Sequence, residues 1–207
     1  MSRSRHAIST QRLKLEPIIP QHADETWPLL DDASLWRFFP ALRPASLEAL
    51  RQRYERRARE QPGDQVWENW ACRIRATGRV AGEVQATIFS AEGVAYIAYM
   101  VYTPHQRRGF AREAAAGVIA HVHADHGVQR ILAEMDVRNA ASIGVVESLG
   151  FTCVEKRVCV ERSSTPEQAD EYLYELDLRR SPLRWETPTP QDTSRHPLQH
   201  GILSPPQ

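Results

Sequence analysis

The sequence predicts an α/β fold built around a mixed sheet, and two stretches of pattern carry this prediction. Strand-like runs at 67–75, 80–89 and 95–101 follow one another closely with glycine-containing turns between them, as in an antiparallel meander. Beyond this meander, helices and strands alternate, which is typical of α/β connections. Together the two stretches predict a mixed sheet of about six to seven strands, antiparallel in its N-terminal part and flanked by helices.

The elements before the meander are a strand and two helices. Residues 10–17 alternate apolar and polar side chains, as in a half-buried strand, and Pro17 ends this strand or places it at an edge. Residues 21–30 predict the first helix. Ser46 has the side chain of an N-cap and begins a strongly charged helix that extends to about residue 60.

The second half of the chain predicts the remaining elements and the domain limits. These elements are a helix at 111–122, a strand at 130–137, a short helix from 140, and strands at 152–160 and 171–178. One domain is therefore expected over 10–178, preceded by an extension at 1–9. Residues 179–207 are rich in proline and polar residues without apolar periodicity, so a flexible tail is expected there.

Composition narrows the class of protein. The chain has 207 residues with 26 basic and 26 acidic side chains, and this zero net charge gives no reason to expect a nucleic acid or an anionic membrane as a partner. Its three cysteines form no CxxC pair, which favours a reduced compartment. Neither a signal peptide nor a long apolar run is present, so a cytoplasmic location is expected.

The stretch Gln106–Ala111, Gln-Arg-Arg-Gly-Phe-Ala, lies between an apolar strand and a helix. The first turn of a helix has backbone N–H groups without internal partners, and the helix dipole adds partial positive charge there. Gly109 permits a turn conformation and a close approach that a Cβ would oppose. Three arginines add full charges nearby: Arg107, Arg108 and Arg112. This turn is expected to bind a pyrophosphate group.

The motif Gln-x-x-Gly-x-Ala, preceded by Met-Val-Tyr-Thr-Pro, resembles the acetyl-CoA pyrophosphate loop of the GNAT superfamily of N-acetyltransferases. The family's other mark follows the strand at 130–137 as Asn139-x-x-Ser142, a short helix and Leu-Gly-Phe. The Asn-x-x-Ser form is similar to the branch that includes ribosomal-protein N-terminal, polyamine and antibiotic acetyltransferases. The resemblance covers about residues 10–178 and is specific over 94–157.

The resemblance implies how acetyl-CoA, the acyl donor, would be held. Two central parallel strands would splay apart, the pantetheine arm would pair with the backbone of the first, and the pyrophosphate would lie on the turn. Asn139 would contact this arm or cap the helix from Ala140. The residues implied in donor binding are Tyr99, Met100, Val101, Arg107, Arg108, Gly109, Phe110, Ala111, Arg112, Asn139 and Ser142. A metal ion is not expected.

Attack of an amine on a thioester requires a base for the amine proton and a donor for the departing thiolate. Glu134, on the strand that borders the splay, is the first candidate for the base or for a water relay, and a matching glutamate occurs in some family members. The alternative is a strand carboxylate that pairs with an arginine. Glu83 and Asp136 are the second candidates.

On the sulfur side the sequence departs from the common family pattern. Many members carry a tyrosine acid seven residues after the asparagine, where this chain has Val146. Members with Asn-x-x-Ser are thought to use the serine hydroxyl as the donor to the departing thiolate, and Ser142 fits this pattern. The alternative role of Ser142 is that of a first-turn helix serine whose hydroxyl bonds to the backbone. Other possible donors are Tyr99, Tyr172 and Tyr174.

The histidines at 121, 123 and 126 resemble a metal-binding set only in composition. A helix turns by about 100° per residue, so the side chains at 121 and 123 point about 200° apart and only 123 and 126 share a face. A solvated helix end is therefore expected. Cys153 is not expected to be a nucleophile, because no histidine-bearing motif accompanies it.

The expected activity is acetyl-CoA-dependent N-acetylation of a primary amine by direct transfer in a ternary complex. The alternative is a non-catalytic acyl-CoA-binding sensor or interaction domain on the same fold, which the missing tyrosine at Val146 favours. A protein N-terminus and a small-molecule amine both remain open as acceptors, and so does a homodimer. Four aromatic residues would form an apolar wall for the acceptor or belong to the core: Trp36, Phe38, Phe39 and Trp70.

Overall fold

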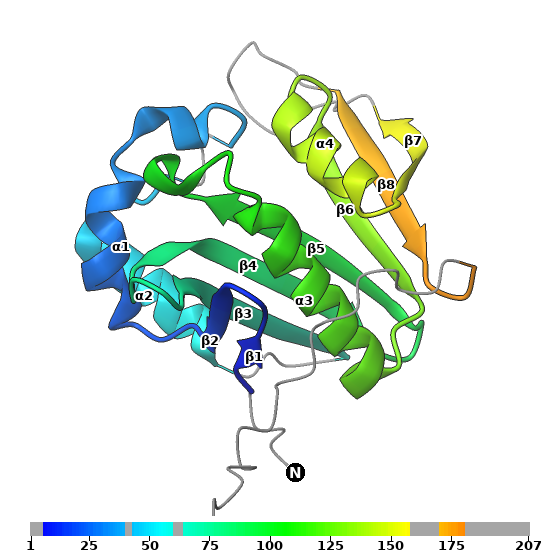
Figure 1. Ribbon diagram of the computed structural model, residues 1–207, viewed down its shortest axis with the longest axis horizontal. Coiled ribbons are helices and arrows are strands. Elements are labelled where there is room, and N and C mark those ends of the chain that lie inside the picture. The colour runs from blue at the N-terminus through cyan, green and yellow to red at the C-terminus, as the bar shows by residue number, and fades with distance from the viewer. Residues whose placement is uncertain (1–5, 40–42, 60–63, 158–169, 181–207) are drawn as a thin grey trace, which may run out of the picture.

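The computed structural model describes residues 6–39, 43–59, 64–157 and 170–180, which form one eight-stranded sheet in the order β1-β2-β3-β4-β5-β6-β8-β7 (Figure 1). The strands are β1 (Ile8–Ser9), β2 (Leu13–Pro17), β3 (Gln65–Ile74), β4 (Val80–Phe89), β5 (Val94–Val101), β6 (Arg130–Asp136), β7 (Thr152–Arg157) and β8 (Glu171–Asp177). All neighbouring strands are antiparallel except β5 and β6, which are parallel.

Helices cover both faces of this sheet. They are α1 (His22–Leu30), α2 (Leu47–Ala58), α3 (Phe110–His126) and α4 (Ala140–Ser148), with short 3-10 turns η1 (Ala33–Trp36) and η3 (Thr103–His105). The helices α3 and α4 share one apolar cluster with the sheet, whereas α1 and α2 pack into a second cluster on the opposite face (Figure 1). None of the described helices is long and apolar enough to span a membrane.

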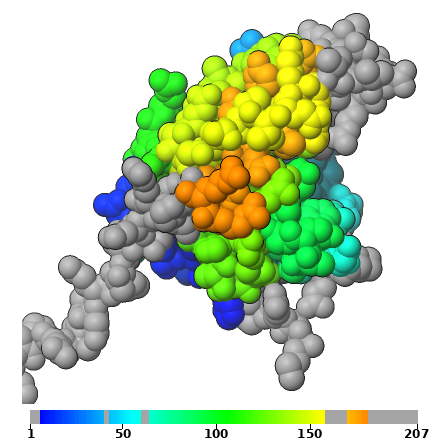
Figure 2. Space-filling view, turned by 90° about the vertical axis from the view of Figure 1, so that its right-hand side faces the viewer, coloured from blue at the N-terminus to red at the C-terminus, as the bar shows by residue number. Residues whose placement is uncertain are grey.

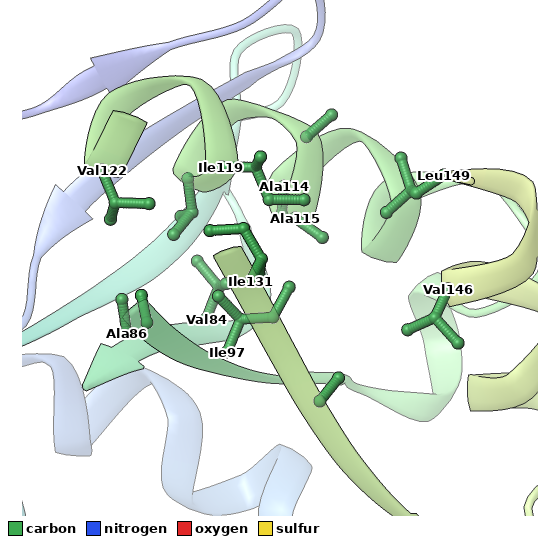
Figure 3. Packing of buried hydrophobic residues seen from close by; sticks show 14 of the residues in the cluster. Val84, Ala86, Ile97, Ala114, Ala115, Ile119, Val122, Ile131, Val146 and Leu149 are labelled. Carbon is green, nitrogen blue, oxygen red and sulfur yellow. The ribbon is translucent and has the colours of Figure 1, made fainter. Parts of the chain in front are cut away.

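The larger cluster holds α3 close to the middle of the sheet (Figure 3). Ala114 and Ala115 face the strands and are almost completely buried, so the helix backbone approaches the sheet closely. Gly117 continues this small-residue surface, because a Cβ there would lie 2.9 Å from Cγ2 of Thr10. Burial of such a helix face is the main source of helix stability in a domain.

The pairing between β5 and β6 is short. Only three residue pairs join them: Val94 with Arg130, Ala95 with Ile131, and Tyr96 with Leu132. Beyond these pairs both strands continue, β5 to Val101 and β6 to Asp136, without pairing to each other. The sheet therefore opens between β5 and β6 into a five-stranded part and a part made of β6, β8 and β7 with α4. Figure 2 views the molecule from the side of this second part, drawn mainly in yellow and orange.

The observed fold confirms the predicted α/β class and the mixed sheet. All seven predicted strands occur, with ends that differ by a few residues, and Ser46 caps α2 by accepting a hydrogen bond from the backbone N–H of Ala49 at 3.1 Å. The eighth strand, β1, lies within the predicted extension at 1–9 and was missed because two residues carry no periodicity. The end of the predicted strand at 158–160 and the tail from 181 lie outside the described residues.

Candidate active site

The turn before α3 has a backbone that its sequence predicts. Gly109 is the residue before the helix and has φ of 78°, and Arg107 has φ of 60°, so both are left-handed. Glycine occupies this region without the clash that a Cβ brings, and Arg107 is the one positive-φ residue among those described that is not glycine. Two left-handed residues so close together curl the chain around the start of α3.

This start of α3 suits an anion. No side chain caps the helix, so the N–H groups of its first turn point outward without a partner. Arg107, Arg108 and Arg112 are exposed around it, whereas the Phe110 side chain is buried and leaves only its backbone to a ligand. Partial positive charge from the helix and full charge from the arginines coincide here.

The same turn is held from the N-terminal part of the chain. The Arg12 guanidinium donates to the carbonyl of Arg108 at 2.8 Å and to Oε2 of Glu113 at 2.6 Å, and it lies 4.8 Å from the centre of the Phe110 ring. The other Glu113 oxygen accepts from the Thr10 hydroxyl and from the Arg12 N–H, both at 2.6 Å. Sequence inspection missed Arg12, because no local pattern indicates a partner about 100 positions away.

The segment Tyr99–Val101 borders the opening between β5 and β6. It pairs on one side with β4, where Gly82 lies opposite Val101, and no described strand pairs with it on the other side. A Cβ on Gly82 would lie 2.1 Å from the carbonyl oxygen of Met100, so only glycine permits this close pairing. The free edge of β5 therefore offers backbone donors and acceptors to an extended ligand.

Across the opening, Asn139 and Ser142 begin α4. The Asn139 side chain accepts a hydrogen bond from the Ser142 N–H at 3.2 Å, which confirms its predicted role as a helix cap. The Tyr99 hydroxyl donates to the carbonyl of Ser142 at 3.1 Å, and burial raises the pKa of this tyrosine. Val146 is fully buried in the core, as Figure 3 shows, so the common tyrosine position does not face the opening.

Glu134 is exposed on β6, beyond the last residue that pairs with β5. Its carboxylate forms an ion pair with Arg157 at 2.6 Å, so the predicted pairing with an arginine is observed. This arginine also binds Glu155 at 2.9 Å. A carboxylate with one exposed and shared partner keeps lone pairs for a water molecule or an amine.

The second candidates for the base are more fully engaged. Asp136 is buried and accepts hydrogen bonds from the N–H and the guanidinium of Arg138, and these bonds lower its pKa. Glu83 accepts from Tyr54, from Tyr102 at 2.9 Å and from Arg57 at 2.8 Å. Both carboxylates are thus fixed by neighbours in the described structure.

The described residues also form a cavity on the α1 and α2 side of β5. Its lining includes Tyr99 and Met100 from β5, Glu83 from β4, Arg53 and Arg57 from α2, and the ring of Trp36. The cavity therefore reaches the strand segment at the opening. Trp36 and Trp70 line it and are also buried, so the two predicted roles of these rings, core and cavity wall, coincide.

The remaining candidates lie elsewhere. The Tyr174 hydroxyl donates to Glu147 at 3.1 Å, and burial together with this carboxylate raises its pKa to about 12. Cys153 is exposed and free.

The expectation of a solvated histidine cluster at the end of α3 was wrong, because His121 and His126 are largely buried and converge on Glu68 of β3.

These features suit an extended, phosphate-bearing ligand, placed where the one parallel strand pair opens beside a helix N-terminus. A family model described as an acetyltransferase (GNAT) domain matches residues 12–152, which is more than half of the chain. The chain belongs to the GNAT acetyltransferase family. No curated protein sequence matches it.

Solved structures share this fold. A GNAT-family acetyltransferase from Bacillus anthracis superposes with a TM-score of 0.72 and 17% identity over 84% of this chain and 99% of the other. The ribosomal alpha-N-protein acetyltransferase RimL, solved with coenzyme A, gives 0.69 and 17% over 83% and 98%. The microcin self-immunity acetyltransferase MccE, solved with acetyl-CoA and AMP, gives 0.69 and 18% over 81% and 93%.

The contacts of Glu113 generate a pH-dependent prediction. Burial alone would raise its pKa, but hydrogen bonds from Thr10 and Arg12 outweigh burial and hold the pKa below the ordinary 4.5. A carboxyl group whose pKa is lower in the folded than in the unfolded state stabilises the fold at pH values above its unfolded-state pKa. This stabilisation is lost as the pH falls through its folded-state pKa. We expect Glu113→Gln to lower the free energy of unfolding by about 1–2 kcal/mol at pH 7 and by less at pH 3.

Urea denaturation at the two pH values measures this difference. Glu55→Gln is the matched control, because Glu55 forms an exposed ion pair with Arg59 one helical turn away, and its loss should change stability by no more than about 0.5 kcal/mol. An equal cost of Glu113→Gln at both pH values would contradict the role given to its charge.

Proposed function

We propose that the protein is an acetyl-CoA-dependent N-acetyltransferase that transfers an acetyl group to a primary amine. The observation that carries this proposal is the opening between β5 and β6 beside the uncapped start of α3. The free edge of β5 matches the amides of a pantetheine arm, and the helix start with its arginines matches a pyrophosphate. The structural neighbours solved with acetyl-CoA or coenzyme A support the same donor.

The residues proposed to hold the donor follow from their positions. The backbone of Tyr99, Met100 and Val101 would pair with the pantetheine arm, and the turn from Arg107 to Arg112 would bind the pyrophosphate. Asn139 and Ser142 would face the arm from the other side of the opening, where they begin α4. Acetyl-CoA supplies the thioester whose acyl carbon accepts the amine.

Glu134 is the proposed base or water relay. It lies on the strand that borders the opening, and its single exposed ion pair leaves it open to solvent, whereas Glu83 and Asp136 are engaged by neighbouring donors. An α-amine with a pKa of about 8 needs less help to lose its proton than a lysine amine at about 10.4. Ser142, held beside Tyr99, is the proposed donor to the departing thiolate.

The charges of the cavity suggest what the acceptor carries besides its amine. Arg53 and Arg57 line the cavity with Glu83, and Glu83 is already paired with Arg57. Among the described residues the Arg53 side chain forms no ion pair or hydrogen bond, and burial and the nearby Arg57 lower its pKa more than the attraction of Glu83 raises it. One uncompensated positive charge favours an acceptor with an anionic group close to its amine.

The function is tested first at the turn. Gly109→Val places a β-branched residue at φ of 78°, which disrupts the turn. We expect the affinity for acetyl-CoA, measured by calorimetry, to fall at least about tenfold, and thiol release with an amine panel to fall with it. Gly127→Val is the control, because Gly127 has φ of 68° at the other end of α3 and suffers the same backbone strain away from the turn.

Equal acetyl-CoA affinity in the two valine variants would remove the turn from the proposed site. Donor binding by the wild-type protein without turnover on any amine would instead support a non-catalytic acyl-CoA sensor on this fold. That alternative is kept because Val146 replaces the tyrosine that many family members use.

The catalytic assignment is tested by three substitutions. Glu134→Gln should lower kcat about 10²- to 10⁴-fold and remove the acidic limb of the pH profile, where activity rises as the base loses its proton, with acetyl-CoA affinity retained. Ser142→Ala should lower kcat and leave this limb in place. Glu83→Gln serves as the comparison, and a larger loss of kcat there than in Glu134→Gln would transfer the role of base to Glu83.

The acceptor preference is tested with pairs of amines that differ by one carboxylate, such as peptides with aspartate or asparagine beside the N-terminal residue. We expect the acidic member to have the higher kcat/KM, and Arg53→Gln to reduce this preference about tenfold. Arg51→Gln is the control, since Arg51 lies on the same helix and pairs with Asp24 instead of lining the cavity. Equal kcat/KM for both members in the wild-type protein would contradict this preference.

A further inference from the structure

A second polar cluster lies at the opposite end of α3 from the proposed donor site. His121 Nε2 lies 2.8 Å from one oxygen of Glu68, and His126 Nε2 lies 3.3 Å from the other. One ligand atom from each of the three residues falls within 4.8 Å of the others. Two imidazole nitrogens and a carboxylate oxygen thus converge on one point between α3 and β3.

The cluster is desolvated. The exposed fractions of the side chains are 9% for Glu68, 10% for His121 and 3% for His126. A buried carboxylate that stays ionised requires a cation beside it, and the C-terminal end of a helix favours positive charge as well.

Asp125 orients the first histidine. Its Oδ2 lies 3.0 Å from Nδ1 of His121, on the far side of the ring from Glu68. With an ion bound, Asp125 would favour the tautomer that carries its proton on Nδ1, and the Nε2 lone pair would then be available to the ion. This carboxylate–histidine arrangement is the one that accompanies histidine ligands in metalloproteins.

We propose that Glu68, His121 and His126 bind one divalent transition-metal ion, with Zn²⁺ the ion whose ligand chemistry they match. Zinc accepts imidazole nitrogen and carboxylate oxygen at bond lengths of about 2.0–2.2 Å, which places neighbouring ligand atoms about 3.4 Å apart in a tetrahedral site. The two distances of 2.8 and 3.3 Å approach this spacing. Water would complete the coordination.

The ion would have a structural role. It would join the last turn of α3 to β3, two elements 53 positions apart in the sequence at His121 and Glu68. His121 and His126 follow Gly109 by 12 and 17 residues, so a rise of about 1.5 Å per residue separates the cluster from that turn by about 18–25 Å. Binding of an ion is read out directly by titration and needs no measurement of acetyl transfer.

The test is calorimetric titration of the chelator-treated full-length protein with ZnCl₂, together with Co²⁺ absorption spectra as a probe of geometry. The wild-type protein is expected to bind one Zn²⁺ at this cluster and to show the intense visible bands of tetrahedral Co²⁺. His121→Gln should lower the zinc affinity at least about tenfold. Asp125→Asn, which keeps all three ligands, should lower it about 10- to 100-fold.

His123→Gln is the matched control. It removes one of the eight histidines as His121→Gln does, but His123 is exposed and its Nδ1 contacts the carbonyl of Val128 instead of the cluster. Zinc affinity should stay unchanged in this variant. The far-ultraviolet circular dichroism of each variant establishes that it is folded before titration.

Two results would overturn the proposal. One is the absence of zinc binding by the wild-type protein. The other is equal zinc affinity in His121→Gln, Asp125→Asn and the control, which would place the ion on histidines elsewhere in the chain. In either case the cluster is an ion-paired contact between Glu68 and protonated histidine, and no metal belongs to it.

Discussion

The hydrogen-bonded contact between β5 and β6 lasts for three residue pairs, and the position at which it ends determines the rest of the site. Past Tyr96 and Leu132 the two strands no longer supply each other with donors and acceptors. Backbone groups in this situation need other partners or solvent. The opening is bordered by Tyr99–Val101 on one side and by the start of α4 on the other, and α3 begins at its rim.

The turn at the rim depends on contacts from distant parts of the chain. Its two left-handed residues shape the turn so that the first N–H groups of α3 point outward. Its position is set by Arg12, which binds both the Arg108 carbonyl and the Glu113 carboxylate. The N-terminal strand region thus holds the segment that the proposed donor would contact. Glycine at position 82 has a similar supporting role, since it lets β4 lie against β5 where that strand loses its other neighbour.

The features that the sequence predicts correctly are those determined by residues close together in the chain. Alternation of apolar residues located the strands, Ser46 and Asn139 cap helices as their side chains indicate, and Gly109 has the positive φ that its motif requires. Partners that meet only after folding were not predictable in this way. Arg12 was missed for this reason, and the histidines of α3 were misjudged because helical spacing says nothing about a glutamate from β3.

The catalytic candidates show the same limit. Position relative to Asn139 placed Glu134 beside the opening, but the sequence could not show that Glu83 and Asp136 would be engaged by tyrosine and arginine donors. It also could not show that Arg53 and Arg57 would share a cavity with Glu83, because α2 and β4 contribute these residues from separate regions. Which charges face a cavity is decided by packing between elements.

The opening also divides the sheet mechanically. Three strands and α4 are joined to the other five strands through a ladder of three pairs and through the contacts of α3 and α4, among them the bond from Tyr99 to Ser142. The proposed donor, lying along the free edge of β5, would replace the missing ladder and act as a ninth strand. Occupancy of this edge would then add to the cohesion of the two parts, and with it to their resistance to proteases.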